Sequence, residues 1–533
     1  MKPTCLPSLM LLLAAASTAA CVASTDQGVE GDEEDLTSLT ARARKLEFAG
    51  YVYVEDNASD TTILAEVKRQ TQSAFGALRE AEIATNSREL KDVDPARFLK
   101  VPVEVVDPAA PEVTPRRLLK VSYTFTDDAL VPIPMATRSA ISLGLLGKGY
   151  QAKAERIIQE CTTGDKHARE FEKSIWYVFN PTLSKCKTAM AAEQQKIDDQ
   201  RRGLAPNQVP KSEVERLYIP MTARLRATAQ NRSTKYPEYD RLFAGGVEPG
   251  KLVIGMVSGM MADWAAGERH DTYEDAGYPM WYGGLREIFH ARPGFALKGV
   301  EGVPNPLEYK VGDTKVAFAS FDDLTAFELD RRNPVGVTSA NRNALRKVIA
   351  DTLVRKWVTF EVPVQVTMGG ETKPLTIKLQ SFFGAETSPV PHKRAIKTSD
   401  IFVYNGHSYI GYGPLDPSRF TAVDFPATYQ VLNVNGCVSY NYYEKDYIPL
   451  KQGGTKNLDL VTNGLESWVN ESGEAMGRFV GAFIDGRMNS YTEILKASQF
   501  TYYGYDWGMD ALRVVDGELD NAYSPRRMPI SVR

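Results

Sequence analysis

The sequence lacks three features that would each assign it to a broad class of protein. It has no internal run approaching the roughly 18 apolar residues of a membrane-spanning helix. Its net charge of −4 provides no basic excess for binding nucleic acid. Its five histidines are scattered, so no metal site and no cofactor are predicted. With 533 residues, 43% of them hydrophobic, the chain is expected to be globular and to form two domains.

The first residues have the pattern of an export signal. One lysine precedes an apolar run from Leu9 to Ala16, and small residues lead up to Cys21. This run is too short to be a stable membrane span, so it is expected to direct export and then to be removed. Cleavage near Ala20 or Ala23 by an ordinary signal peptidase would give a secreted protein.

The letters TAAC at 18–21 favour a second outcome, in which the protein keeps a lipid anchor. They resemble a bacterial lipobox, where the cysteine becomes the lipid-bearing first residue, although Thr18 stands where leucine is usual. We therefore expect a signal and lipobox at 1–21, with Cys21 as the lipidation site, and an acidic tether at 22–44. The expected product is an exported, membrane-anchored lipoprotein, periplasmic or on the cell surface of a bacterium.

Cysteine is scarce, and its few positions are informative. The five are Cys5, Cys21, Cys161, Cys186 and Cys437. Cys5 would leave with the signal and Cys21 would carry lipid. In an oxidising compartment Cys161 and Cys186 can pair, so a disulfide closing a loop of 25 residues is expected. Cys437 then has no partner, which makes it either a buried, inert thiol or a reactive one.

The chain up to residue 310 mixes strand and helix patterns. Residues 46–57 alternate as a strand does, and 61–84 carry apolar residues at spacings of three and four, as a helix does. Two further strands are expected at 98–107 and 117–127. These patterns predict an α+β domain at 45–310, with no recognised chemistry.

The pattern of apolar residues changes from about residue 315 onward. Three apolar runs, at 399–406, 428–436 and 457–464, each end in Asn-Gly. Runs of this kind are typical of fully buried parallel strands. A helix with a small-residue face is expected to follow at 471–486. The sequence therefore predicts an α/β domain at 311–533, built on a mostly parallel sheet with flanking helices.

The first Asn-Gly run is followed at once by a histidine and a serine. Gly-His-Ser nearly fits the G-x-S-x-G motif of serine hydrolases, but Ile410 stands where the second glycine is needed. Gly and Pro residues follow Ser408 where that motif requires a helix. His407 is also the last histidine in the chain, so no base follows the serine. A serine hydrolase is therefore not expected.

A cysteine nucleophile is the competing hypothesis. His407 follows the first Asn-Gly run and Cys437 follows the second, 30 residues later, which is enough for one crossover. If the two strands are parallel neighbours, both side chains stand at the carboxyl edge of the sheet, where ligands bind. An imidazole there can take the proton of the thiol and activate it. Taken singly, each residue would more often be structural.

The two blocks DIFVYNGHS and VLNVNGC resemble the caspase/legumain/gingipain clan of cysteine peptidases, and its gingipain-like bacterial branch in particular. In that clan a histidine follows one hydrophobic block, commonly as His-Gly, and the cysteine ends the next block after a small residue. The resemblance covers roughly 375–515. It departs from the pattern at Ser408, where glycine is usual, and in the aromatic run VSYNYYEKDY after Cys437.

The resemblance implies a caspase-like C-terminal domain and an exported cysteine endopeptidase that cleaves a peptide or protein substrate. Cys437 would be the nucleophile, and His407 the acid/base that protonates the leaving amine. The backbone N–H groups of Ser408 and Cys437 would form the oxyanion hole. Aromatic residues are expected to line the substrate pocket, namely Tyr409, Tyr412, Tyr440 and Tyr442. The alternative is a catalytically inactive surface lipoprotein that keeps the fold as a binding or structural module.

Overall fold

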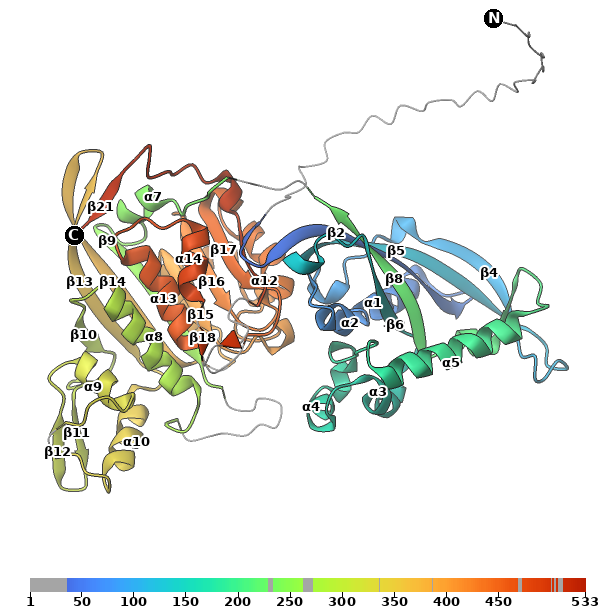
Figure 1. The fold of residues 1–533 in the computed structure, drawn as a ribbon, viewed down its shortest axis with the longest axis horizontal. Helices are drawn as coiled ribbons and strands as arrows, with labels where there is room; N and C mark the ends of the chain where they lie inside the picture. The colour runs from blue at the N-terminus through green and yellow to red at the C-terminus, as the bar shows by residue number, and fades with distance from the viewer. Residues whose placement is uncertain are drawn as a thin grey trace, which may run out of the picture. The chain divides into compact units, whose positions relative to one another are not determined.

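Two β-sheets organise the chain (Figure 1). The computed structural model describes residues 36–533 apart from 229–232, 262–271, 335, 386, 468–471, 500, 503–504 and 507–510. The export signal, the lipobox with Cys21 and most of the expected tether therefore lie outside the described residues.

The first sheet has seven strands, and most of them are antiparallel. Its order is β6 (Ala140–Leu146), β8 (Tyr218–Ala227), β2 (Ala41–Glu55), β5 (Arg116–Pro132), β4 (Leu99–Val106) and β7 (Gln208–Pro210), with β3 (Ala84–Thr85) also on β5. Alternate residues of β2, such as Leu46, Phe48 and Val52, are buried, as the period of two predicts.

Helices accompany this sheet. They are α1 (Asp60–Gln72), α2 (Phe75–Glu80), α3 (Ala154–Cys161), α4 (Asp165–Glu170), α5 (Ser184–Arg201) and α6 (Lys211–Val214), with a 3₁₀ helix at Glu172–Tyr177. Ser59 caps α1, because its hydroxyl accepts a hydrogen bond from the Thr62 N–H at 3.2 Å. The single helix expected at 61–84 is thus divided into α1, α2 and the short strand β3.

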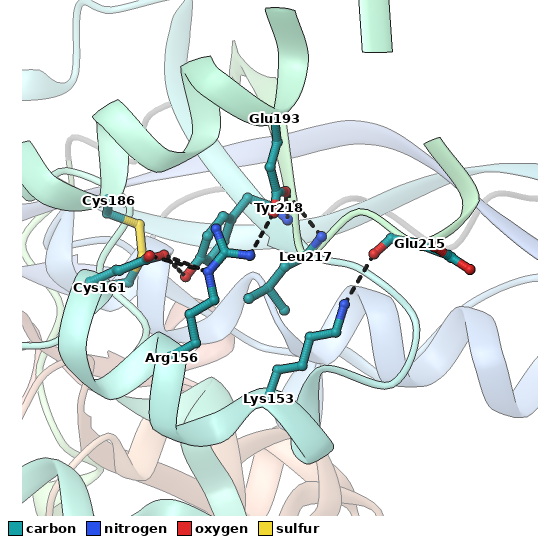
Figure 2. A network of polar contacts seen from close by, with 9 residues as sticks. Lys153, Arg156, Cys161, Cys186, Glu193, Glu215, Leu217 and Tyr218 are labelled. Atoms are coloured by element: carbon teal, nitrogen blue, oxygen red, sulfur yellow. Dashed lines mark hydrogen bonds and ion pairs between the residues drawn. A yellow bond between two sulfur atoms is a disulfide. The ribbon is translucent and has the colours of Figure 1, made fainter. Parts of the chain in front are cut away.

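The expected disulfide is present and joins α3 to α5 (Figure 2). Cys161 and Cys186 have their Cα atoms 4.7 Å apart. Polar contacts run alongside the disulfide, since Arg156 of α3 forms an ion pair with Glu193 of α5 at 3.0 Å. Glu193 also accepts a hydrogen bond from the backbone N–H of Tyr218 at 2.9 Å. Both helices are thereby fixed to strand β8.

The second sheet has ten strands and contains the three Asn-Gly runs. Its order is β1 (Thr37–Ser38), β20 (Arg513–Asp516), β17 (Leu458–Asn463), β16 (Gln430–Asn435), β15 (Ile401–Asn405), β9 (Lys251–Gly259), β14 (Glu371–Ala385), β13 (Trp357–Met368) and β10 (Ala296–Val300), with β21 (Ile530–Val532) also on β13. From β17 to β14 all neighbours are parallel. The expected α/β class is therefore confirmed, but the sheet expected to be mostly parallel is mixed, because the strands outside this central group pair antiparallel.

The boundary between the two sheets lies earlier in the chain than residue 310, where the sequence placed the domain boundary. Strands β9 and β10 precede that position, yet both belong to the ten-stranded sheet, and the seven-stranded sheet ends at Ala227. The sheet that a strand joins depends on the distant strands with which it pairs, and the local sequence pattern does not show which strands those are. The tether expected to reach residue 44 is also shorter, because Thr37 and Ser38 already pair with β20.

Helices cover both faces of the central strands. Along β15, Phe402 and Tyr404 belong to one buried cluster with α11 (Val390–Thr398) and α12 (Ser439–Tyr447), whereas Ile401 and Val403 belong to another. The second cluster includes α8 (Gly277–Ala291), α13 (Ser472–Ile484) and α14 (Tyr491–Ser498). The remaining helices are α7 (Tyr239–Phe243), α9 (Phe321–Glu328) and α10 (Arg342–Leu353). Two short antiparallel pairs complete the described strands. They are β11 (Glu308–Val311) with β12 (Thr314–Ala317), and β18 (Thr501–Tyr502) with β19 (Tyr505–Asp506).

Glycines let α8 and α13 lie side by side (Figure 1). A Cβ atom added at Gly477 would stand 2.3 Å from the carbonyl oxygen of Gly284, so the two helix backbones are almost in contact. This is the small-residue face that the sequence predicted for 471–486. Among the described helices, none has the length and apolar content to cross a bilayer.

The seven-stranded and ten-stranded sheets share one buried cluster. From Glu34 to Arg533 the chain forms one compact unit. Phe75 of α2 stacks on Tyr442 of α12 with ring centroids 6.3 Å apart, and the Asn441 side chain donates to the Ser87 carbonyl at 2.7 Å. Residues far apart in the sequence can therefore contribute to a common site.

Removing the disulfide should destabilise the seven-stranded part. A Cys161→Ser/Cys186→Ser double variant frees a loop of 25 residues in the unfolded chain, which corresponds to about 3 kcal/mol of unfolding free energy. Denaturant unfolding followed by circular dichroism measures the change. An unchanged midpoint would show that the contacts of Arg156 and Glu193 alone fix these helices.

Candidate active site

The two chemistry-bearing residues follow neighbouring strands. Strands β15 and β16 are parallel, and their register pairs Ile401 with Val431 and Asn405 with Asn435. His407 and Cys437 each stand two residues beyond that last pair. The expectation that both strands end on the same edge of one sheet is confirmed.

His407 and Cys437 line the same cavity, which has a volume of about 430 Å³. Glu466 and Ser467, which follow strand β17, line it as well. The rest of the wall comes from the loop after β15 and from the seven-stranded part, namely Ser408, Tyr409, Ile410, Arg79, His167, Phe171 and Tyr177. A volume of this size is in the range of small-molecule and side-chain binding pockets.

A row of asparagines lies at the strand ends that lead into this cavity. The side chain of Asn435 donates to Asn405 at 2.9 Å and accepts from Asn463 at 2.8 Å. Arg513 of the antiparallel strand β20 donates to Asn463 at 3.0 Å and to Asn435 at 3.3 Å. The three Asn-Gly sequences thus place one hydrogen-bonded ladder across β15, β16 and β17, and the ladder holds the three strand ends level.

The glycines after these asparagines permit close approach of the loops. A Cβ atom added at Gly436 would lie 3.2 Å from the Gly406 carbonyl oxygen and 3.4 Å from the Ser408 Cβ atom. The Ser408 hydroxyl donates to the Cys437 carbonyl at 2.6 Å and so joins the two loops. Ser408 has an ordinary φ of −84°, so a serine is accommodated where the resemblance would have glycine.

Backbone strain is concentrated on the residues next to the pair. Tyr409, Ile410 and Val438 have φ angles of 51°, 53° and 54°. Positive φ costs a non-glycine residue of the order of 1–3 kcal/mol and is found most often at functional sites. Val438 also directly precedes α12, so Cys437 stands at the amino end of that helix, where the helix dipole favours a thiolate.

The thiol itself is protonated at neutral pH. Burial raises the pKa of Cys437 to about 11, and the negative charge of Glu466 adds to the rise. Hydrogen bonds with the Ser467 backbone and hydroxyl act in the opposite direction. The Cys437 Sγ atom lies 3.8 Å from the Ser467 carbonyl oxygen, to which it donates. A nucleophilic thiolate would therefore require a base at the moment of attack.

One of the four predicted pocket tyrosines lies in the cavity. Tyr409 lines it, with its ring edge-on to His407 at a centroid distance of 5.7 Å. Tyr412 is exposed and does not line it. Tyr440 and Tyr442 are each 1% exposed and belong to buried clusters, because residues 439–447 form helix α12 and its tyrosines pack inward.

The aromatic wall comes instead from the seven-stranded part. Phe171 and Tyr177 stack with ring centroids 4.9 Å apart, and both line the cavity. No local sequence signal links them to Cys437. Glu466 had a weaker signal, because it lies two residues after the third Asn-Gly run, whereas His407 and Cys437 directly follow the first two.

The acidic residue Asp275 has a structural role just before α8. Buried Asp275 accepts hydrogen bonds from the backbone N–H groups of Met261 and Gly277, at 2.8 and 2.7 Å, at the start of α8. His270 and Asp271 lie outside the described residues. Across the part of the chain that the structure describes, no three His, Cys, Asp or Glu side chains are grouped as metal ligands would be.

Comparison with known proteins gives no assignment. No family model matches the chain, and no curated protein or solved structure has significant similarity to it.

The asparagine ladder should contribute measurably to stability. Asn435→Ala would leave the side chains of Asn405, Asn463 and Arg513 each short of a buried partner, so the unfolding free energy is expected to fall by about 1–3 kcal/mol. Chemical denaturation measures the loss, with the exposed Asn305→Ala variant as the control. Equal stability of both variants would contradict a structural role for the ladder.

Proposed function

We propose that this protein is an exported cysteine endopeptidase, with Cys437 as nucleophile and His407 as its acid/base partner. The observation that carries the proposal is the shared cavity at the carboxyl ends of two parallel neighbouring strands, with one of the two residues just beyond each strand end. Strain at Val438 and the loop bond from Ser408 to the Cys437 carbonyl support it, because both fix the geometry around the thiol.

The same features support a caspase-like domain. The resemblance required a histidine after one hydrophobic block and a cysteine after the next, on parallel strands of one sheet. Strands β15 and β16 have that arrangement, with helices on both faces. A repeated Asn-Gly ending on β17 extends the pattern by one strand and adds Glu466 to the site.

The proposed reaction is acyl transfer from a peptide to the thiol. His407 takes the Cys437 proton, which is required because the thiol is protonated at neutral pH. The sulfur attacks the peptide carbonyl carbon, and the backbone N–H groups of Ser408 and Cys437 are the proposed donors to the oxyanion. The carbon–nitrogen bond then breaks, and His407 protonates the leaving amine. Water, deprotonated by His407, hydrolyses the thioester and restores the thiol.

A second candidate is a binding lipoprotein without catalysis, and one observation favours it. The Cys437 thiol is half-buried with a pKa raised to about 11, as in an inert structural cysteine. The cavity would then bind a peptide segment without cleaving it. The aromatic pair Phe171 and Tyr177 would serve in either case as an apolar contact surface.

Substitution of the pair tests catalysis. Cys437→Ala and His407→Ala are each expected to lower the cleavage of a mixed peptide library by at least about a thousandfold, since removing a nucleophile or its base removes the covalent route. Mass spectrometry of the products gives both the rate and the cleaved bonds. His290→Ala, on an exposed histidine of α8, is the matched control and should retain full activity.

Export and anchoring form a separate part of the proposal. The signal predicted at 1–21 and the disulfide between Cys161 and Cys186 both favour a compartment outside the cytoplasm. The expected partners are a peptide or protein substrate and, through Cys21, a membrane.

Loss of the lipidated cysteine should release the protein. Cys21→Ser is expected to move it from the membrane fraction to the soluble fraction, because a diacyl-type anchor needs that thiol. Fractionation followed by immunoblotting measures the distribution. Membrane association that persists in the variant would favour a secreted protein retained by a partner.

A further inference from the structure

Glu466 and Cys437 are neighbours in the cavity, although they follow different strands. Glu466 stands three residues after the end of β17, and its side chain is 34% exposed. Its negative charge opposes ionisation of the Cys437 thiol. A carboxylate beside a nucleophilic thiol is unfavourable for catalysis unless a positive charge offsets it.

Arg79 of α2 supplies that positive charge from the seven-stranded part. Its guanidinium forms an ion pair with Glu466 and is only 14% exposed. It lies 4.8 Å above the ring of Tyr177, whose hydroxyl donates to the same Glu466 oxygen at 3.2 Å. Arg79 also pairs with Glu80 at 2.6 Å. The guanidinium is therefore held in place from three sides.

Three phenols around the thiol stay uncharged while the thiol ionises. Tyr177 lines the same cavity, as does Tyr409, and Tyr404 of β15 and Tyr443 of α12 interact electrostatically with the thiol. Burial raises the pKa of Tyr177, Tyr404 and Tyr443 well above the ordinary value, so these phenols remain uncharged.

The histidines His167 and His407 complete the set of titratable groups that line the cavity. Substitutions at Arg79 or Glu466 leave both rings in place. Arg79 and Glu466 are therefore the two fixed charges that can set the ionisation of the thiol in the alkaline range.

We infer that Arg79 is a positioning residue for the Cys437 site, which acts by pairing with Glu466 and so limiting the effect of that carboxylate on the thiol. The inference rests on the proposed function for its biological meaning, but its physical content is independent of any cleavage. It gives the seven-stranded part a direct role, because α2 would control the reactivity of a cysteine more than 350 residues away in the chain.

The rate of alkylation of Cys437 by iodoacetamide tests this inference on the full chain between pH 8 and 11. Removing the negative charge in Glu466→Gln should lower the thiol pKa by about one unit and raise the rate at pH 9 about tenfold. Arg79→Gln leaves Glu466 without its counter-charge, so the pKa should rise and the rate should fall by a similar factor. Mass spectrometry of the Cys437 peptide measures the adduct.

The double variant separates charge from structure. Arg79→Gln/Glu466→Gln removes both charges at once, so its rate should lie between the rates of the two single variants. Arg79→Lys keeps the charge but loses the planar contact with Tyr177, so it should react faster than Arg79→Gln. Arg226→Gln, an exposed arginine paired with Glu47, is the control for loss of a surface charge and should leave the rate unchanged.

Two results would overturn the inference. One is a Glu466→Gln rate no higher than that of the parent, and the other is an Arg79→Gln rate equal to or above it. If Arg79→Gln proves unfolded by circular dichroism, the double variant decides the question instead, since a rate equal to or above that of Glu466→Gln would show that Arg79 has no effect on the thiol. A protein that cleaves no peptide can still give the predicted shifts, so failure of the proposed peptidase and failure of this inference are distinguishable.

Discussion

The asparagine ladder across β15, β16 and β17 is the interaction on which the geometry of the site depends. Parallel strands can slip in register, and a shift of one residue would send each following side chain to the other face of the sheet. Asn405, Asn435 and Asn463 prevent this at the strand ends, because their amides pair only when the strands are level. Arg513 closes the row from an antiparallel strand.

The level strand ends explain why three loops converge. His407 and Cys437 directly follow the first two Asn-Gly sequences, Glu466 follows the third after Leu465, and all three line one cavity. Gly436 lets two of the loops touch, and Ser408 bonds them together. Strain at Val438 is the local cost of this arrangement, and it is tolerated because the sheet below is rigid.

The seven-stranded part completes the site and also gives it an unusual electrostatic character. It contributes a stacked aromatic pair and the guanidinium of Arg79 to the cavity wall. The thiol is consequently surrounded by apolar rings and by one pair of opposite charges. Such an environment keeps the resting thiol protonated, and it makes activation by His407 a requirement of the proposed chemistry.

The sequence predicted those features that repeat or alternate along the chain. The buried strands ending in Asn-Gly, the neighbouring positions of His407 and Cys437 and the short disulfide loop were all readable, because each depends on local spacing. The sequence did not reveal that β9 belongs to the second sheet, since the sequence of a buried strand does not show which strands it pairs with.

The misplaced tyrosines have a related cause. Residues 439–447 were expected to contribute side chains to the pocket, but they form a helix whose tyrosines pack into the core. Tyrosine is common in both settings, so composition alone does not distinguish them. Phe171 and Tyr177 were missed for the opposite reason, because only tertiary packing brings them to Cys437.

Labelling with a thiol-reactive peptidyl ketone tests the central claim most directly, because it requires both a peptide-binding cavity and an activated cysteine. We expect one covalent adduct, located at Cys437 by mass spectrometry, and its rate should fall by at least about a hundredfold in the His407→Ala variant. Labelling that is absent, or that proceeds equally fast without His407, would contradict a Cys437–His407 pair.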